Sequence, residues 1–173
     1  ARMHPTPGAL YAAFDVFPRA KGSSSHIASM VQGLERCFGS VRLLCLGLED
    51  MPAYQREGGI EIFRFRRRRR DLLRRATEYA QFVARHVRQL RGKLELAVFR
   101  DPWSGYPLLR SGAGCPAIFE VNALPSWELE YSRPGLAANT ALLEKLRDME
   151  RFCLRGARRL LCVSSVTKRA LER

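Results

Sequence analysis

The chain has 173 residues, of which 46% are hydrophobic and 27% charged, and its 30 Lys and Arg against 17 Asp and Glu give a formal net charge of +13. This length and apolar content suit one globular domain with its own core, and they exclude a disordered or fibrous chain. No apolar run approaches the roughly 18 residues that a spanning helix needs, and the charge favours anionic partners such as nucleic acid, acidic lipid or phosphorylated substrates.

The first elements predict a strand, a helix and a second strand. The apolar run Leu10–Val16 is typical of a buried strand, and it ends in a loop of small residues. Apolar side chains at helical spacing then predict a one-sided helix over residues 26–38, with Ser24 or Ser25 as its N-cap. The run Val41–Leu46 predicts the next buried strand.

The middle of the chain continues this alternation. We expect a polar connection over residues 47–59, a strand over Ile60–Phe65 and a long helix with a basic outer surface over residues 71–90. Between the last two lies the run Arg66–Arg70. Such a run is usually a solvated loop or helix start, and its functional interpretation is contact with anionic lipid or nucleic acid.

The remaining elements complete an alternating order. We predict strands over residues 94–99, 116–121 and 158–163, and helices over residues 106–110 and 139–154, with a further helix capped by Ser164 and Ser165. The segment 122–135 is expected to be polar, aromatic and irregular. Strands that alternate with helices predict an α/β fold, a three-layer sandwich in which a mostly parallel sheet of about six strands carries helices on both faces.

The cysteines and the chain ends indicate the cellular compartment and the domain organisation. The five cysteines lie apart without a C-x-x-C pair, which indicates reduced, buried thiols. The N-terminus has no basic-then-apolar signal segment, so we expect a cytoplasmic protein. The chain opens without Met and stops in what reads as a new helix, so we expect residues 1–173 to be one domain of something larger.

Polar residues gather in the loops that follow the predicted strands. In an open parallel sheet these loops meet at one edge, where ligands bind. The candidate substrate-binding residues there are Lys21, Gly22, Ser23, His26, Asp101, Trp103, Asn122, Trp127, Glu128 and Ser164. Two interpretations stay open at this stage: Gly22 allows close approach of a ligand or belongs to an ordinary turn, and His26 contacts substrate or packs on that turn.

Several common chemistries lack their motifs. The first loop has neither G-x-G-x-x-G nor G-x-x-x-x-G-K-[ST], so dinucleotide binding and nucleotide hydrolysis are disfavoured. No His, Cys or carboxylate cluster has metal-ligand spacing, and no G-x-S-x-G elbow is present. We therefore expect no metal and no cofactor, and we assign no catalytic residue. A sugar-nucleotide epimerase is disfavoured because a Tyr-x-x-x-Lys pair is also missing.

Three segments together resemble a known family. They are the loop Pro18–Ile27 with its glycine and His26, the stretch Ile118–Pro125 with the core Glu120-Val121-Asn122, and residues 143–164. In this order they resemble the N-terminal domain of a family-4 glycosyltransferase of the GT-B type. The resemblance implies a Rossmann-like domain on the acceptor side of a cleft, and a C-terminal donor-binding domain that this chain lacks.

The resemblance also implies a reaction and roles for residues. It implies transfer of a sugar from a nucleotide-diphosphate sugar to a glycan or lipid-linked acceptor, without a metal, and a fragment that is inactive alone. Gly22 and its neighbours would approach the donor diphosphate, and His26, Asn122, Trp127 and Glu128 would line the acceptor side. Many relatives have His where this chain has Asn122.

Two further hypotheses concern the positive charge. The run Arg66, Arg67, Arg68, Arg69 and Arg70 would suit docking on the inner face of an acidic membrane that carries a lipid-linked acceptor. The alternative function is a non-enzymatic basic α/β domain that binds nucleic acid or an anionic surface. Steeply salt-dependent association with arbitrary duplexes would mark that alternative, which we consider the weaker hypothesis.

Overall fold

The computed structural model of the chain describes residues 6–66, 71–132 and 134–172. Its strands are β1 Ala9–Val16, β2 Val41–Leu46, β3 Tyr54–Glu57, β4 Ile60–Phe65, β5 Leu96–Phe99, β6 Ala117–Val121 and β7 Arg159–Cys162. Its helices are α1 Gly22–Phe38, α2 Leu72–Gln89, α3 Pro102–Ser111, α4 Pro125–Ser132, α5 Pro134–Ala137, α6 Thr140–Gly156 and α7 Ser165–Leu171.

The strands form one sheet in the order β3-β4-β2-β1-β5-β6-β7. Every neighbouring pair is parallel except β3 with β4, so the expected fold class, a mostly parallel sheet covered by helices, is confirmed. The expected count of about six strands missed β3, which lies inside the predicted polar connection 47–59. This short polar strand forms a hairpin with β4 through Gly58, whose positive φ of 59° suits a tight turn.

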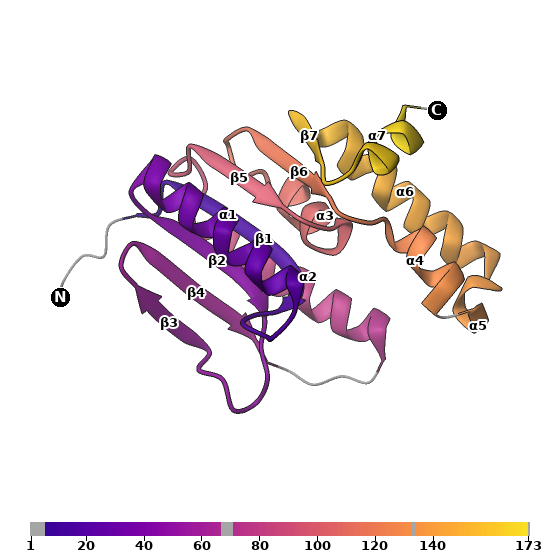
Figure 1. The fold of residues 1–173 in the computed structure, drawn as a ribbon, viewed down its shortest axis with the longest axis horizontal. Coiled ribbons are helices and arrows are strands. Elements are labelled where there is room, and N and C mark those ends of the chain that lie inside the picture. The colour runs from indigo at the N-terminus through magenta and orange to yellow at the C-terminus, as the bar shows by residue number, and fades with distance from the viewer. Residues whose placement is uncertain (1–5, 67–70, 133, 173) are drawn as a thin grey trace.

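Helices cover both faces of the sheet, as Figure 1 shows. The side chains of β1 alternate: Leu10 and Ala12 join the cluster formed with α2, α3 and α6, whereas Tyr11 and Ala13 join the cluster formed with α1. Strand β4 alternates in the same way, since Ile62 faces α1 and Phe63 faces α2. Both faces of the central strands are therefore buried, which explains their unbroken apolar runs.

Several element boundaries differ from the expectations. Helix α1 begins at Gly22 rather than near residue 26, and the predicted serine N-cap is wrong: Lys21 takes the N-cap position without a side-chain cap bond. Ser24 is instead buried inside the first turn, where its Oγ accepts a hydrogen bond of 2.8 Å from the N–H of Arg19. The segment expected to be irregular contains α4 and α5, and α3 begins at Pro102 because Asp101 caps it.

The predicted cap of the last helix is present: Ser164 accepts from the N–H of Thr167 at the start of α7. Two further helices have side-chain caps, since Asp71 accepts from the N–H of Arg74 at the start of α2, and Asn139 accepts from the N–H of Leu142 at the start of α6. The cysteines are free thiols, but only Cys45 and Cys153 are buried, and Cys37 is exposed. The expectation of reduced, buried thiols therefore holds for these two residues and is wrong for Cys37.

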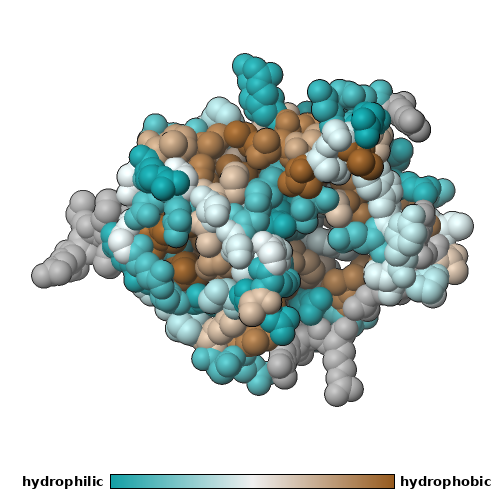
Figure 2. All heavy atoms as spheres, viewed as in Figure 1, coloured by the Kyte–Doolittle hydropathy of each residue, from teal (hydrophilic) through white to brown (hydrophobic). Residues whose placement is uncertain are grey.

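The sheet ends on an apolar edge. Strand β7 pairs with β6, and its Leu160 and Leu161 are 42% and 45% exposed. Val163, just after the strand, and Val166 in α7 are also exposed, and Figure 2 shows apolar side chains at the surface in the upper part of the view, where β7 lies. Exposed aliphatic side chains on neighbouring positions are typical of an interaction surface.

Helix α3 lies directly on β5 because of Gly105. A Cβ at this position would lie 2.3 Å from ring atoms of Phe99, whose ring stacks on that of Phe119 at 4.7 Å. We expect Gly105→Ala to lower the free energy of unfolding by about 1–3 kcal/mol, because the ring has no free space to move into. The matched control is Gly33→Ala in α1, where a Cβ would meet nothing within 4 Å and helix propensity predicts a gain of up to about 1 kcal/mol. Urea denaturation measures both, and equal effects would contradict this packing.

A buried histidine joins α2 to the outer strands. The ring of His86 lies 4.6 Å from that of Phe63 and 4.7 Å from that of Phe82, and its Nδ1 has no hydrogen-bond partner among the described residues. Burial, with smaller effects of Arg42 and Arg85, lowers the pKa of His86 from 6.5 to about 4. The folded protein therefore keeps this ring neutral at pH values where the unfolded chain is protonated.

Because of this histidine, the free energy of unfolding decreases as the pH falls. Its contribution is fully present above pH 6.5 and is lost as the pH falls, because the unfolded chain binds the proton first. Between pH 7 and pH 4 we expect the wild type to lose about 3 kcal/mol more unfolding free energy than His86→Leu, which does not titrate. Urea denaturation of both proteins at both pH values measures this difference, in which the contributions of the carboxylates cancel. A difference that does not change with pH would contradict the neutral buried ring.

Candidate functional site

The carboxyl ends of β1, β5 and β6 meet at one edge of the sheet, and two cavities open there. The first, which we call the α1 cavity, has a volume of about 570 Å³ and is lined by Gly22, Ser23, His26, Arg100, Asn122 and residues 161–163. The second, the α4 cavity, has a volume of about 310 Å³ and lies against Phe14, Asp101, Trp103 and α4. Arg100 and Asn122 line both cavities, so the two adjoin.

The α1 cavity receives the N-terminus of α1. No side chain caps this helix, and its first residue, Gly22, is exposed and has no atom within 4 Å of where a Cβ would lie. The fold itself therefore does not require glycine here, whereas a ligand close to the backbone would. The backbone N–H groups and the dipole of a helix N-terminus favour negative charge.

A buried carboxylate lies behind this cavity. Glu120 in β6 is fully buried, and its Oε2 accepts a hydrogen bond of 2.9 Å from the hydroxyl of Tyr11. Its Oε1 lies 2.8 Å from Nε2 of His26. Burial, followed by the charge of Glu120, raises the pKa of Tyr11 above its ordinary value, so Tyr11 remains a hydrogen-bond donor.

Arg100, which directly follows β5, is the fourth residue of this cluster. It is 7% exposed, and its guanidinium donates to the carbonyl oxygen of Ser23 at 3.2 Å, which joins the end of β5 to the first turn of α1. Its positive charge also acts on Tyr11, opposing the effect of Glu120. A buried arginine beside a helix N-terminus provides a strongly positive environment for an anion.

Buried polar atoms without hydrogen bonds concentrate at this edge. Five such side-chain atoms occur in the described part of the chain, and four of them belong to Ser23, His26, Arg75 and Glu120. The contact between His26 and Glu120 has the length of an ion pair but not the angle of a hydrogen bond, which is why both atoms count among the four. Buried polar groups are usually paired in native proteins, so this concentration is typical of a site that awaits a ligand.

The α4 cavity has an aromatic wall. The rings of Phe14 and Trp103 lie 5.9 Å apart, and the guanidinium of Arg75 lies 5.4 Å from the ring of Phe14. Asp101 accepts hydrogen bonds from the N–H groups of Phe14 and Ser104, at 2.7 and 2.8 Å. Burial raises the pKa of Asp101 to about 6, against the opposing effect of these bonds. Asp101 thus ties the end of β1 to α3, and its oxygens already have partners.

The structure brings seven of the ten predicted residues to the two cavities. Gly22, Ser23, His26 and Asn122 line the α1 cavity, and Asp101, Trp103, Glu128 and again Asn122 line the α4 cavity. The other three lie outside both linings. Lys21 forms an ion pair with Asp15, Trp127 is 38% exposed, and Ser164 caps α7 by accepting from the N–H of Thr167.

Three residues of the cluster were not selected from the sequence. Tyr11 and Glu120 lie inside strands, and Arg100 directly follows one. Only Glu120 carried a usable signal, because an ionisable residue within an apolar strand is buried and must find partners. Its contacts with Tyr11 and His26 join residues 109 and 94 positions apart, which no local pattern indicates.

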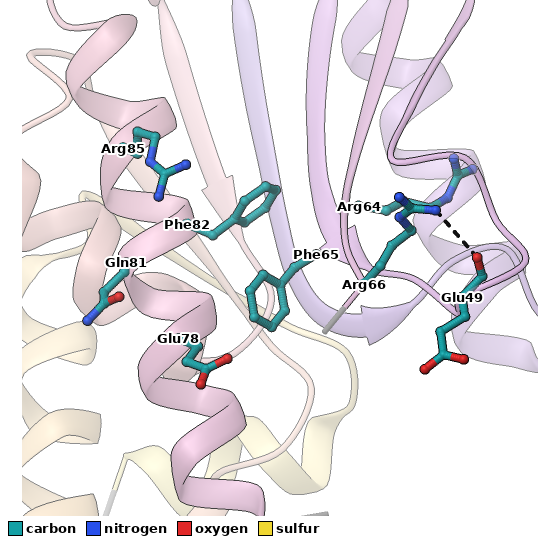
Figure 3. Close-up of a pocket in the computed structure, with 8 residues that line it drawn as sticks. All are labelled: Glu49, Arg64, Phe65, Arg66, Glu78, Gln81, Phe82 and Arg85. Atoms are coloured by element: carbon teal, nitrogen blue, oxygen red, sulfur yellow. Dashed lines mark hydrogen bonds between the residues drawn. The ribbon is translucent and has the colours of Figure 1, made fainter. Parts of the chain in front are cut away.

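A third cavity lies away from this cluster, between the end of β4 and α2 (Figure 3). It has a volume of about 520 Å³, and Phe65 and Phe82 point toward one another between Arg66 and Arg85. Arg64 at its edge is structural: its guanidinium donates to the carbonyl oxygens of Phe17 and Pro52 and to Oε1 of Gln55. Arg66 donates to the carbonyl oxygens of Glu49 and Met51. Residues 67–70 of the arginine run lie outside the described residues.

Comparison with known families assigns the chain. Residues 21–173 match the profile of the family described as Glycosyl transferase 4-like domain. The chain belongs to this family. The match begins in the loop before α1, and it includes every strand of the sheet except β1. The expected glycosyltransferase resemblance is therefore confirmed.

A solved structure supports the fold. The chain is similar to sucrose-phosphate synthase from Thermosynechococcus elongatus, with a TM-score of 0.67 and 14% sequence identity. The similarity covers 95% of this chain and 44% of the synthase, so the chain spans less than half of the length of that enzyme. A search of curated protein sequences finds no match.

The described residues contain neither a metal-ligand cluster nor a membrane-spanning helix. Within residues 6–66, 71–132 and 134–172, no three His, Cys, Asp or Glu side chains gather as metal ligands would. In the same ranges, no helix combines the length and the apolar character needed to cross a membrane. The expectation of a reaction without metal or cofactor stays a prediction.

Proposed function

We propose that this chain is the N-terminal, acceptor-side half of a glycosyltransferase that moves a sugar from a nucleotide-diphosphate sugar to a glycan or lipid-linked acceptor. The observation that carries the proposal is the α1 cavity, where the uncapped N-terminus of α1 lies beside the buried guanidinium of Arg100. The leaving group in such a reaction is a nucleoside diphosphate, and its developing charge needs fixed positive partners. Family membership supports the same reaction class.

The adjoining cavities suit two substrates. In this proposal the diphosphate lies at Gly22 and Ser23, while the acceptor extends past Asn122 into the α4 cavity, between Trp103 and Glu128. Aromatic rings pack against the apolar face of a sugar, and carboxylate and amide groups bind its hydroxyls. Arg100 and Asn122, which line both cavities, would contact both substrates.

The proposal includes a second domain that binds the donor. Two observations support it: the similar synthase is more than twice as long as the matched region, and the apolar side chains of β7 and α7 are exposed. A second domain that closes over the sheet edge would exclude water from the α1 cavity. Exclusion of water strengthens the electrostatic stabilisation of a leaving diphosphate without a metal.

Substitution at Gly22 tests the donor position. In the full-length protein we expect Gly22→Leu to raise KM for the nucleotide sugar by at least about tenfold, because the side chain occupies the space of the diphosphate. Gly33→Leu is the matched control in the same helix, since a Cβ there also meets nothing within 4 Å. Release of nucleoside diphosphate from a panel of nucleotide sugars measures transfer. Equal effects of the two variants, or no transfer from any sugar of the panel, would overturn the proposal.

We also propose that the arginine run docks the protein on an anionic membrane. Arg66 is exposed, and exposed Arg74, Arg85 and Arg88 of α2 extend the positive surface beyond it. Each basic side chain near an acidic lipid surface contributes about 1 kcal/mol, so a run of five is sufficient for reversible docking. Docking would bring the acceptor cavity to a lipid-linked substrate.

Liposome sedimentation tests the docking. We expect the protein to pellet with vesicles in which about a third of the lipid is phosphatidylserine, but not with neutral vesicles. Replacement of Arg66–Arg70 by Ser should abolish pelleting. The control removes the same charge at another part of the chain. It replaces five other arginines by Ser: Arg147, Arg151, Arg155, Arg158 and Arg159. Equal loss in both variants would mean that net charge alone, rather than the run, accounts for binding. Pelleting that survives removal of the run would reject the docking surface.

A further inference from the structure

Glu120 is the most costly residue of the cluster to bury. An ionised carboxylate loses favourable hydration in a protein interior unless partners replace the water. Glu120 is 0% exposed, and its two oxygens face two different partners, Tyr11 and His26. Apolar side chains make up the core cluster on the α1 side of the sheet, and a buried carboxylate costs more there than a side chain of that kind. The presence of a carboxylate at this buried position therefore points to a role exerted through one of its partners.

The orientation of His26 identifies that partner. Nε2 of His26 is buried against Glu120, yet the side chain as a whole is 42% exposed and lines the α1 cavity. Nε2 contributes nothing to this exposure, whereas Nδ1 is not among the buried unpaired atoms and has no hydrogen-bond partner among the described residues, so Nδ1 is accessible. Tyr11 holds the carboxylate from the other side with a bond of 2.9 Å, so the group that orients His26 is itself fixed.

We propose that Glu120, held by Tyr11, is a positioning residue that keeps Nε2 of His26 turned inward, so that Nδ1 accepts a hydrogen bond from a hydroxyl of the bound sugar substrate. This inference rests on the proposed function and deepens it by naming the atom that contacts the sugar. A ring that carries its proton on Nε2 has its lone pair on Nδ1, and a hydroxyl is the donor that matches it. The helix N-terminus and Arg100 already provide for the phosphates.

The poor alignment of the contact between His26 and Glu120 is consistent with this role. The two atoms are 2.8 Å apart without the geometry of a hydrogen bond. Hydrogen bonds of this kind are often poorly aligned in the free protein and align when the substrate binds. A sugar hydroxyl on Nδ1 would turn the ring and bring the N–H on Nε2 into line with Oε1.

Nitrogen spectroscopy of the histidines tests the orientation without any assay of transfer. The sequence contains 3 histidines, so few nitrogen signals are expected from this domain in 15N-histidine-labelled protein. The signals that disappear in His26→Gln are those of His26. At a pH where the ring is neutral, we expect His26 to carry its proton on Nε2 alone. In the double variant Tyr11→Phe with Glu120→Leu, which removes both buried polar partners together, we expect the nitrogen shifts to become the average of two tautomers.

Two comparisons make this test decisive. Glu150→Gln alters another buried carboxylate, which accepts from Ser126 at 2.6 and 2.7 Å, and it should leave the signals of His26 unchanged. A wild-type ring with its proton on Nδ1, or with both tautomers populated, would overturn the proposal even if the double variant does not fold. Unchanged His26 signals in a folded double variant would overturn it as well.

Transfer kinetics test the contact with the hydroxyl. The amide of Asn occupies the place of Nδ1 and that of Gln the place of Nε2, so we expect His26→Asn to keep about tenfold more kcat/KM than His26→Gln. Equal values, or a better Gln variant, would place the contact on the other nitrogen, and tighter binding of free UDP to the wild type than to His26→Asn would instead indicate a phosphate contact. Both results would overturn this inference. Absence of transfer in the wild type would count against the proposed function only, because the spectroscopic result stands independently.

Discussion

The parallel pairing of β1 with β2 on one side and β5 on the other is the constraint on which the site depends. Parallel strands end at the same edge, so the loops after β1, β5 and β6 meet although they are separated by long stretches of chain. The apolar character of both faces of β1 requires helices on each side, and α1 must therefore start at this edge. The position of the helix N-terminus beside Arg100 follows from that requirement.

Electrostatics at this edge follows from burial more than from net charge. The chain carries a charge of +13, but the charges that define the α1 cavity are one buried arginine and one buried glutamate. Because water is excluded around them, their effects on Tyr11 are strong enough to appear in its pKa. The exposed arginines of α2 contribute to a diffuse field that attracts anionic surfaces and is weakened by salt.

Much of the fold could be predicted from the sequence, because apolar runs and helical spacing specify buried strands and one-sided helices locally. The cap at Ser164 was recognised because a hydroxyl side chain directly precedes the predicted last helix. Strand β3 was missed because a polar edge strand has no alternation against a core, and the start of α1 was misplaced because three consecutive serines offer several equivalent caps. The candidate edge was predictable from topology, whereas the cluster of Tyr11 and Glu120 depends on contacts between distant strands.

Arg64 gives the fold a mechanical property. One guanidinium binds the backbone after β1 through Phe17, the backbone before β3 through Pro52, and the side chain of Gln55 within β3. These hydrogen bonds join the three segments, so a shift of the loop that leads toward Gly22 away from the hairpin formed by β3 and β4 would break a bond to Arg64. The same side chain lines the cavity in Figure 3, so a single guanidinium joins a wall of that cavity to the loop that follows β1.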